Sequence, residues 1–429
     1  MEKAWKQAQN ITGVETDSKL LASQVYNRNG VSTIDSMKVQ PGMTLLVSSW
    51  KWGGGDLRPG AKLIDRQGHT IHTWQPDRDE LFPDPVGLKN SIPNRQNFHG
   101  SYLLPGGDLI LLFSYIGAVR INACGDVLWR LEGGNHHAVA RSEDGTFWMP
   151  GTSSERRMKT SKHPNGFPGI NKPVWVDQMV HVTEDGDVID NINVLDAIYN
   201  NDLGRYLVEG LGPLRGPLEV SDDPAHLNDI EPLSSSMAKE YPLFDAGDLL
   251  VSLRVANLIF VFDPDSGDVK WHTSDPFIHQ HDPDFVGDGW IRVFDNNTDL
   301  AGRGKMLGGS RIIALQPHTN STKVLFPTRQ SDPFYTRFRG KQQSLENENM
   351  LLTEARAGRV VEIDTTGRTV WEWIHKSTDD SKVPIVTKAS RHALTREDVA
   401  SWPCSSIDSS TQKQQLVQRN CFRQLSPCV

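Results

Sequence analysis

A hairpin phrase that recurs six times constrains the fold of this chain more than any other feature. Each copy has an apolar pair, a short turn rich in Asp, Asn or Gly, and a short strand that often carries Trp. The copies lie at 62–74, 119–131, 181–192, 261–271, 312–326 and 361–373, and the one at 312–326 is the weakest. A glycine at the tip supplies the positive φ of a tight hairpin, and the flanking alternation of apolar and polar residues indicates strands. Each copy therefore predicts the outer hairpin of a four-stranded sheet.

A second phrase precedes each hairpin and predicts the two inner strands of the same sheet. Its copies lie at 98–114, 136–151, 225–254, 280–296 and 342–355, whereas the opening unit has only its second half, at 44–52. Four-stranded units repeated radially are typical of propellers. We therefore predict an all-β, six-bladed β-propeller whose incomplete first blade is closed by the opposite end of the chain.

The predicted propeller spans 41–375, with an N-terminal extension at 1–40 and a C-terminal extension at 376–429. The C-terminal extension carries a Cys-rich tail that we expect to pack on the propeller. Three long inserts rich in Gly, Pro and Asn interrupt the repeat and are expected to form loops over one face. They lie at 151–180, 196–224 and 297–309.

Composition narrows the partners and the compartment. The net charge of −8 over 429 residues disfavours nucleic acid, and no run of 18 apolar residues predicts a membrane span. The first 25 residues do not form a signal peptide, so a cytoplasmic protein and one whose leader was removed both remain open. Three of the four cysteines (Cys124, Cys404, Cys421 and Cys428) lie in the polar tail, where a disulfide would favour an oxidising compartment.

A histidine recurs at matching points of the second phrase in four units, as His99, His137, His226 and His281. The fifth copy has Gln343 there. The first strand of each blade lies nearest the axis, so the four imidazoles are expected to converge at one mouth of the central channel. One such histidine alone would most simply bond a neighbouring blade, but the set indicates a site, in which His99 best fits a structural role.

Other polar residues accompany the histidines. Asn228 lies in PAHLNDI, Arg254 interrupts an aliphatic strand, and HQHD supplies Gln280 and Asp282 on either side of His281. Asp282 can fix the tautomer of its neighbour or serve the turn, and Arg254 can meet an Asp or a bound anion. Arg, Asn and His donors suit a sulfate-like or phosphate-like oxyanion, toward which imidazole can act as a nucleophile. A metal is possible but not indicated, because no His-x-x-x-His spacing occurs.

The order of these motifs resembles the bacterial arylsulfotransferases, which are PAPS-independent aryl sulfate sulfotransferases. The shared phrases are HH, D-P-x-H-x-N-D-I, an S-x-R strand leading to D-x-x-x-G-x-V-x-W, and Q-H-D with F-D-N. The resemblance covers roughly 40–375 and is most specific at 222–296, and the ASWPC phrase of the tail also resembles family members.

The resemblance implies a ping-pong transfer of a sulfuryl group from an aryl sulfate to a phenol, without PAPS or another cofactor. It implies His281 as the nucleophile that forms a sulfo-histidine, Arg254 and His226 as ligands of the sulfuryl oxygens, and His137 as a further oxyanion or leaving-group contact. The candidates for substrate binding are Asn228, His136, Gln280 and His99. Members of this family suggest a periplasmic or extracellular location.

This chain departs from the family pattern in its last blade, and two other functions stay open. The lysine and threonine that the family contributes from later blades have no clear match, and Gln343, Ser344, Glu354 and Arg356 stand in that region. Glu354 would suit a sulfate pocket only if it paired with Arg356. The alternatives are a metal-assisted lyase or hydrolase that uses the histidine cluster, and a non-catalytic binding module on the same propeller.

Overall fold

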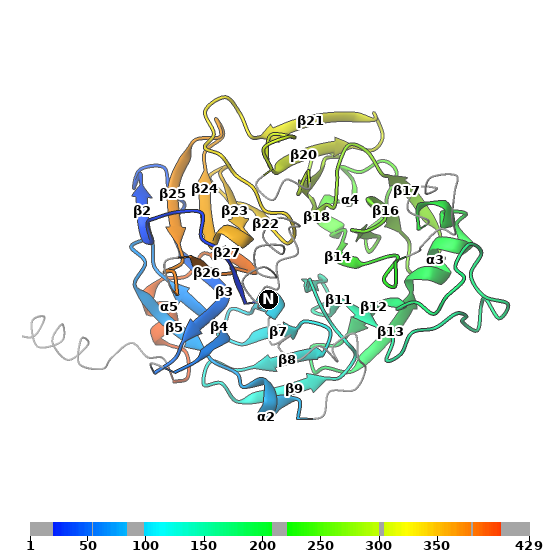
Figure 1. Ribbon diagram of the computed structural model, residues 1–429, viewed down its shortest axis with the longest axis horizontal. Helices are drawn as coiled ribbons and strands as arrows, with labels where there is room; N and C mark the ends of the chain where they lie inside the picture. Colours follow the sequence, from blue (N-terminus) through cyan, green and yellow to red (C-terminus); the bar gives the residue numbers. More distant parts are fainter. Residues whose placement is uncertain are drawn as a thin grey trace, which may run out of the picture.

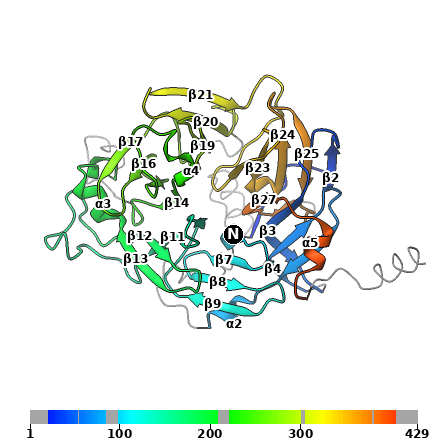
Figure 2. The same ribbon diagram turned by 180° about the vertical axis from the view of Figure 1, so that it is seen from behind.

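Six sheets surround a central axis as the blades of a propeller, which Figures 1 and 2 show from its two faces. This computed structural model describes residues 20–53, 55–83, 98–207, 221–299, 304–378 and 381–404. The all-β, six-bladed architecture predicted from the repeats is confirmed.

Every blade contains four antiparallel strands in sequence from the axis outward. Blade 1 consists of β27 (Lys388–His392), β3 (Met43–Lys51), β4 (Leu57–Ile64) and β5 (Thr70–Trp74), and blade 2 of β6 (Phe98–Leu103), β7 (Leu109–Phe113), β8 (Gly117–Ile121) and β9 (Val127–Leu131). Blade 3 consists of β10 (Ala140–Arg141), β11 (Phe147–Thr152), β12 (Asp177–Val182) and β13 (Val188–Asn193), and blade 4 of β14 (Leu227–Pro232), β15 (Leu249–Leu253), β16 (Leu258–Phe262) and β17 (Val269–Thr273). Blade 5 consists of β18 (His281–Phe285), β19 (Ile291–Asp295), β20 (Arg311–Gln316) and β21 (Ser321–Phe326), and blade 6 of β22 (Lys341–Ser344), β23 (Met350–Glu354), β24 (Arg359–Ile363) and β25 (Thr369–Ile374).

Strands from both ends of the chain complete the ring. β27 pairs with β3 and supplies the inner strand that the opening unit lacks, so the expected closure is made by the C-terminal part of the chain. β2 (Gly30–Ile34) adds a fifth, outermost strand to blade 6 by pairing with β25. β2 precedes the predicted limit of 41 and β27 follows that of 375, so the ring takes in strands from both segments that the sequence assigned to extensions.

Short helices and one small sheet complete the described elements. They are α2 (Arg78–Leu81), α3 (Val194–Asn200), η1 (Gly204–Tyr206), α4 (Ser235–Ala238), η2 (Ala355–Ala357), α5 (Arg396–Ala400) and the pair β1 (Leu21–Ser23) and β26 (Lys382–Pro384). The insert predicted as a loop at 196–224 therefore contains helical turns, and its residues 208–220 lie outside the described part. Among the described helices, none has the length and apolar character needed to cross a membrane.

The outer hairpins use the predicted turn chemistry. Five tips carry a glycine with φ between 81° and 92°, at Gly68, Gly125, Gly186, Gly267 and Gly367. The weakest copy, in blade 5, places Asn320 there at φ 54°, and Asn tolerates this left-handed conformation better than most residues. The hairpins are thus equivalent despite their different sequences.

Apolar side chains between neighbouring blades form the core. Between blades 2 and 3, for example, Leu112 packs in one cluster with Phe147 and Val180, all at most 4% exposed. Such inter-blade packing fixes each sheet against the next. It holds the inner strands, and the residues at their ends, at a constant distance from the axis.

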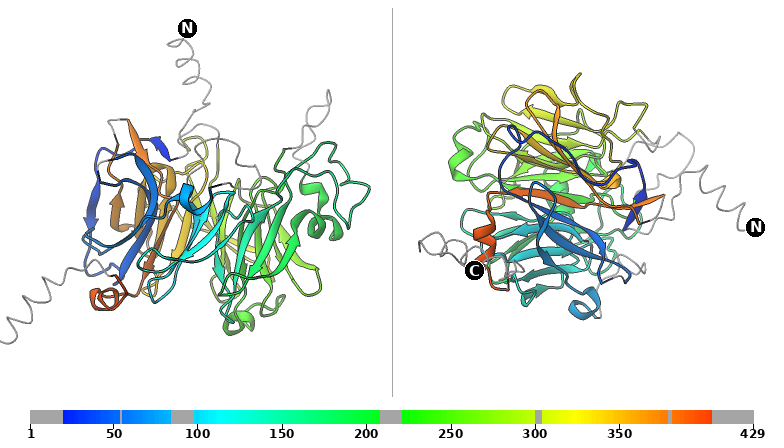
Figure 3. Two further views of the ribbon diagram at one scale, coloured as in Figure 1. Left: turned by 90° about the horizontal axis from the view of Figure 1, so that it is seen from below. Right: turned by 90° about the vertical axis from the view of Figure 1, so that its left-hand side faces the viewer.

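The strand order sends chemically different segments to the two faces of the ring. Connections from second to third strands, and from each blade to the next, leave on one face, which we call the upper face. The three long inserts follow β11, β13 and β19, so all three leave from the upper face, as predicted. In the left view of Figure 3, α5 (red) lies on the opposite, lower side of the ring.

The C-terminal segment is fastened to the lower face. The indole of Trp402 packs against Trp74, with ring centroids 6.0 Å apart, and its Nε1 donates to the carbonyl of Pro105 at 3.0 Å. A disulfide joins Cys404 to Cys124 at the tip of the outer hairpin of blade 2. The predicted docking of the tail is seen here as far as residue 404, and Cys421 and Cys428 lie outside the described residues.

Replacing Cys124 with serine is expected to lower the free energy of unfolding by about 2–4 kcal/mol, because the cross-link closes a very long loop and restricts the unfolded chain. Thermal unfolding with and without a reductant measures the effect. The wild-type protein should lose stability on reduction, whereas the variant should respond little. Equal responses of the two proteins would contradict a stabilising role for this bond.

Candidate active site

The predicted histidines meet at the upper mouth of the channel. The ring of His137 lies at their centre, with centroids 3.9 Å from His99, 5.0 Å from His226 and 6.4 Å from His281. These residues are at or just before the first strands of blades 2 to 5, which all begin at the upper face. The structure thus brings together all four residues that the repeat singled out.

Several residues at this mouth have left-handed backbone conformations. His137 has φ 62°, His226 has φ 51° and Arg339 has φ 63°. Such angles are uncommon for residues other than glycine and cost free energy, and they concentrate at functional sites. The surrounding blades hold these three residues in positions that a relaxed chain would avoid.

One tautomer of His281 is specified by its neighbours. Its Nδ1 lies 2.6 Å from Oδ1 of Asn296 and 3.1 Å from the carbonyl oxygen of His279, both acceptors, so Nδ1 carries the proton. The amide of Asn296 is itself oriented, because its Nδ2 donates to the carbonyls of Thr336 at 2.8 Å and Arg339 at 2.7 Å. The other nitrogen of His281, Nε2, therefore keeps its lone pair and accepts the backbone N–H of Arg339 at 3.2 Å.

The electrostatic surroundings keep His281 neutral. Burial, followed by the positive charge of Arg254, lowers the pKa of His281 well below its usual value. Burial and the neighbouring histidines lower the pKa of His137 in the same direction. Neutral imidazole is the form that can attack an electrophile.

His226 and Arg254 are placed beside each other. Nδ1 of His226 lies 2.6 Å from a carboxylate oxygen of Asp223, which leaves its Nε2 available on the other side of the ring. The backbone N–H of Arg254 donates to the carbonyl of His226 at 3.1 Å. The charge of Arg254 also helps to lower the pKa of His279, to about 4, after the larger effect of burial.

His136 lies behind His137, away from solvent. The two Nδ1 atoms are 2.6 Å apart, so one of them donates a proton to the other. Nε2 of His136, which is fully buried, lies 3.8 Å from Oδ1 of Asp177, whose other oxygen accepts the backbone N–H of Leu227 at 2.8 Å. A carboxylate and two imidazoles thus follow one another toward the mouth.

Asn228 and Gln280 are engaged with protein groups. Nδ2 of Asn228 donates to the carbonyl of Gln280 at 2.7 Å, and the Asn228 side chain is almost fully buried. Nε2 of Gln280 lies 3.1 Å from each of three oxygens in blade 4, those of Ser252, Leu253 and Leu258. These contacts fasten the first strand of blade 5 to blade 4.

The last blade differs from the register expected for it. Gln343 exchanges two hydrogen bonds with the backbone of Arg391 on β27, at 2.9 and 2.7 Å, and so serves ring closure. Arg339 is the residue of this blade that reaches His281. With Asn296, it is a site residue that the repeat did not reveal, although Asn296 ends the F-D-N phrase that resembles the family.

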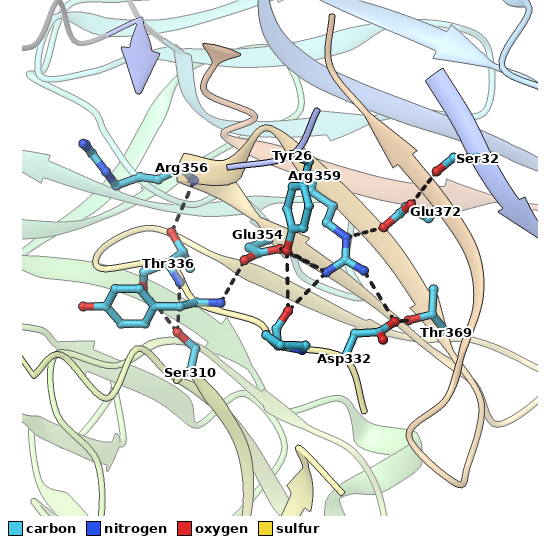
Figure 4. Close-up of polar contacts among 12 residues, drawn as sticks. Tyr26, Ser32, Ser310, Asp332, Thr336, Glu354, Arg356, Arg359, Thr369 and Glu372 are labelled. Carbon is cyan, nitrogen blue, oxygen red and sulfur yellow. Dashed lines mark hydrogen bonds and ion pairs between the residues drawn. The ribbon is translucent and has the colours of Figure 1, made fainter. Parts of the chain in front are cut away.

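Glu354 pairs with Arg359 and not with Arg356 as the sulfate pocket required. One oxygen of Glu354 lies 3.2 Å from Nη1 of Arg359 and accepts the Tyr26 hydroxyl at 2.9 Å, and the other accepts the backbone N–H of Tyr335 at 2.9 Å. Figure 4 shows this network, with the side chain of Arg356 directed away from it. Its carboxylate is thus held away from the Arg356 guanidinium.

A buried ionic cluster lies on the inner strands, next to the histidines in sequence. Nζ of Lys341 bonds Asp229 at 2.6 Å and Asp282 at 2.5 Å, and Asp282 also accepts the backbone N–H of Gln342. Burial alone would lower the pKa of Lys341, but the two carboxylates raise it, so the lysine stays charged. Asp282 thus serves this cluster and does not set the tautomer of His281.

Metal-ligating groups were searched across the described residues. No set of three or more His, Cys, Asp or Glu side chains there is arranged to hold a metal ion.

Comparison with known proteins supports a family assignment. A family model described as "Arylsulfotransferase (ASST)" matches residues 100–376, and no curated protein matches the chain. Among solved structures, a Bacteroides caccae protein of unknown function is 13% identical, with 80% of this chain and 99% of that chain covered and a TM-score of 0.48. Virginiamycin B lyase from Staphylococcus aureus is 13% identical (69% and 74% covered, TM-score 0.35), and the WD40 β-propeller domain of Doa1 is 10% identical (86% and 94% covered, TM-score 0.39). Since the family model spans more than half of the sequence, this chain belongs to the arylsulfotransferase family.

Proposed function

We propose that this protein transfers a sulfuryl group from an aryl sulfate to a phenolic acceptor through a sulfo-histidine at His281. The observation that carries the proposal is the fixed state of this side chain. Its Nδ1 is committed to Asn296 and its pKa is lowered by burial, so a neutral ring with a lone pair on Nε2 is available at the mouth. Family membership supports an enzyme that acts on small aryl compounds.

In the first half-reaction, Nε2 of His281 attacks the sulfur of the donor. An N–S bond forms, the S–O(aryl) bond breaks, and the aryl oxide leaves with the electron pair and takes up a proton. Arg254 and His226 hold the sulfuryl oxygens, whose negative charge a guanidinium and an imidazole N–H can stabilise. For this step, Nε2 must exchange its long hydrogen bond from Arg339 for the sulfur atom.

In the second half-reaction, an acceptor phenol attacks the sulfur, the N–S bond breaks, and the acceptor gives up the proton of its hydroxyl. The complete cycle is therefore neutral in protons. His137, beside His226 and His281, is assigned to receive this proton and to return it to the next leaving aryl oxide. His136 can hold His137 in the required tautomer through their short Nδ1 contact.

The remaining predicted residues receive supporting roles in this proposal. Asn228 and Gln280 position the inner strands, since their amides already bond protein groups. His99 is assigned to the wall of the pocket because its ring stacks on His137. No nucleotide cofactor takes part. The disulfide between Cys124 and Cys404 is consistent with an oxidising compartment, and we place the protein in the periplasm or outside the cell.

Incubation with 4-nitrophenyl sulfate in the absence of acceptor tests the proposal. One equivalent of 4-nitrophenol should be released in a burst, and the intact protein should gain the mass of one SO₃ group, which peptide mapping should locate on His281. Adding phenol should remove the label and yield phenyl sulfate. Absence of release with several aryl sulfates, or a label on another residue, would contradict it.

A further inference from the structure

Arg339 places a buried guanidinium at the mouth of the channel, and its backbone already serves His281. Its side chain is only 8% exposed, and within the described residues its Nη1 has no hydrogen-bond partner. A buried guanidinium nitrogen without an acceptor is costly, because it has lost water and gained nothing in exchange. The left-handed φ of Arg339 adds to the cost of keeping the residue there.

The groups around Arg339 lack the carboxylate that usually neutralises a buried arginine. Burial, and then the charge of Arg356, lower the pKa of Arg339 to about 9. Glu354, two residues before Arg356, is held by Arg359 and Tyr26 on the other side of the strand end, as Figure 4 shows. Nε2 of His99 is likewise buried without a partner among the described residues, and the charge of Arg339, after burial, helps to lower its pKa. Two unpaired polar groups of the mouth therefore adjoin each other.

Aromatic faces border this position. The guanidinium of Arg356 lies 4.6 Å from the ring centroid of Phe338, and the Tyr115 ring, near enough to affect Arg339, lies 4.3 Å from that of His136. A substrate ring can pack on such faces while a substituent reaches the guanidinium. The position thus offers contacts for an aryl group as well as for an anion.

Arg339 and Arg254 act on different sides of the histidine cluster. Arg254 follows β15 of blade 4 and affects His279 and His281, whereas Arg339 precedes β22 of blade 6 and affects His99 of blade 2. In the proposed reaction, the sulfuryl group takes the side of Arg254. Its single charge therefore leaves the Arg339 side to be filled by another group.

We infer that Arg339 and His99 form a second anion subsite, which binds a carboxylate or sulfate substituent on the aromatic ring of the substrate. The preferred substrates are then phenols and aryl sulfates that carry a second acidic group. The inference rests on the proposed function for the aryl nature of the ligand, but the preference for charge is a property of binding alone. An anion at this place accepts hydrogen bonds from both unpaired groups and offsets the cost of burying the guanidinium.

Calorimetric binding of 4-hydroxybenzoate and 4-hydroxybenzamide, repeated with the 3-hydroxy isomers, tests the subsite without any turnover. The wild-type protein should bind a carboxylate more tightly than the amide of the same shape. Arg339→Gln should weaken carboxylate binding about 10- to 100-fold, as expected for a lost charged hydrogen bond, and leave amide binding nearly unchanged. Arg368→Gln, an exposed arginine on the outer hairpin of the same blade, is the matched control and should change neither.

The outcomes separate this inference from the proposed function. Equal binding of acid and amide by the wild-type protein, or an equal loss of both in Arg339→Gln, would overturn the second subsite even if sulfuryl transfer is observed. A charge preference that depends on Arg339 would support it even if no donor transfers its sulfuryl group. With active enzyme, Arg339→Gln should raise KM for 4-hydroxybenzoate as acceptor and leave KM for phenol unchanged.

Discussion

Replacing His281 with alanine is expected to lower kcat/KM for aryl sulfate by about 10⁴- to 10⁶-fold, the range seen when an enzyme loses its nucleophile. The loss should appear in both half-reactions, because the same nitrogen accepts and returns the sulfuryl group. Steady-state release of 4-nitrophenol measures it. His69→Ala provides a control, since His69 lies on an outer hairpin with a side chain that is 70% exposed, and it should keep full activity.

A second variant, Asn296→Ala, distinguishes a fixed nucleophile from a merely buried histidine. Without the Asn296 acceptor, the proton of His281 is free to move to Nε2, so kcat should fall by about 10²-fold or more while the ring remains in place. Asn297→Gly is its matched control, because the Asn297 amide also donates to two carbonyls, of Leu307 and Gly309, without touching His281. Similar kcat values for these two variants would argue against the assigned tautomer.

The pH dependence of the wild-type reaction follows from the same environment. The pKa of His281 is lowered, so its ring loses its proton at a lower pH than a free imidazole does, and Nε2 stays available as pH falls toward 6.5. The acidic limb of kcat/KM should therefore lie below pH 6.5.

The outer blades could be predicted because their signals are local. A turn glycine and the alternation beside it lie within a dozen residues, and all six hairpins formed where this pattern occurs. The closing strand β27 was missed as part of the ring because its sequence, KASRH, carries no apolar alternation. An innermost strand lines the polar channel and closes the ring by backbone pairing, so it does not need large apolar residues.

The site was predictable only as far as the repeat reached. His137, His226 and His281 share a register, and that register placed them correctly together. Asn296 and Arg339 contact His281 across 15 and 58 residues, through folding of the blades around the axis, which no local pattern encodes.

The misassigned partner of Glu354 has a similar origin. Arg356 is the nearer residue in sequence, but it lies in the turn η2, whereas Arg359 begins the next strand and lies directly opposite Glu354 in the antiparallel register. Sequence proximity thus favoured the wrong arginine, and strand pairing decided the correct one.

Replacing Lys341 with methionine is expected to lower the free energy of unfolding by about 3–5 kcal/mol, the usual cost of removing one partner of a buried ion pair. The change leaves Asp229 and Asp282 buried without their shared cation. Glu231, whose pKa is raised to about 8 by burial and by these two carboxylates, cannot supply a compensating charge. Urea denaturation followed by tryptophan fluorescence measures the loss.

The pH dependence of this loss identifies its cause. In Lys341→Met, burial holds the pKa of Asp229 above its unfolded value without opposition from the lysine, so folding favours the protonated acid. Its stability relative to wild type should then be best below about pH 4, where both states are protonated, and should decline as pH rises through the raised folded pKa. A deficit that is constant with pH would indicate lost packing of the lysine stem.

A triple variant completes the test by removing the charges together. Lys341→Met combined with Asp229→Asn and Asp282→Asn should recover much of the lost stability, because neutral amides have a smaller desolvation cost than unpaired carboxylates. Asp282 adjoins His281 and Asp229 adjoins Asn228, so the triple variant should also recover more activity than Lys341→Met alone. Recovery of stability without activity would mean that the charge of Lys341, and not only its hold on the two inner strands, contributes to sulfuryl transfer.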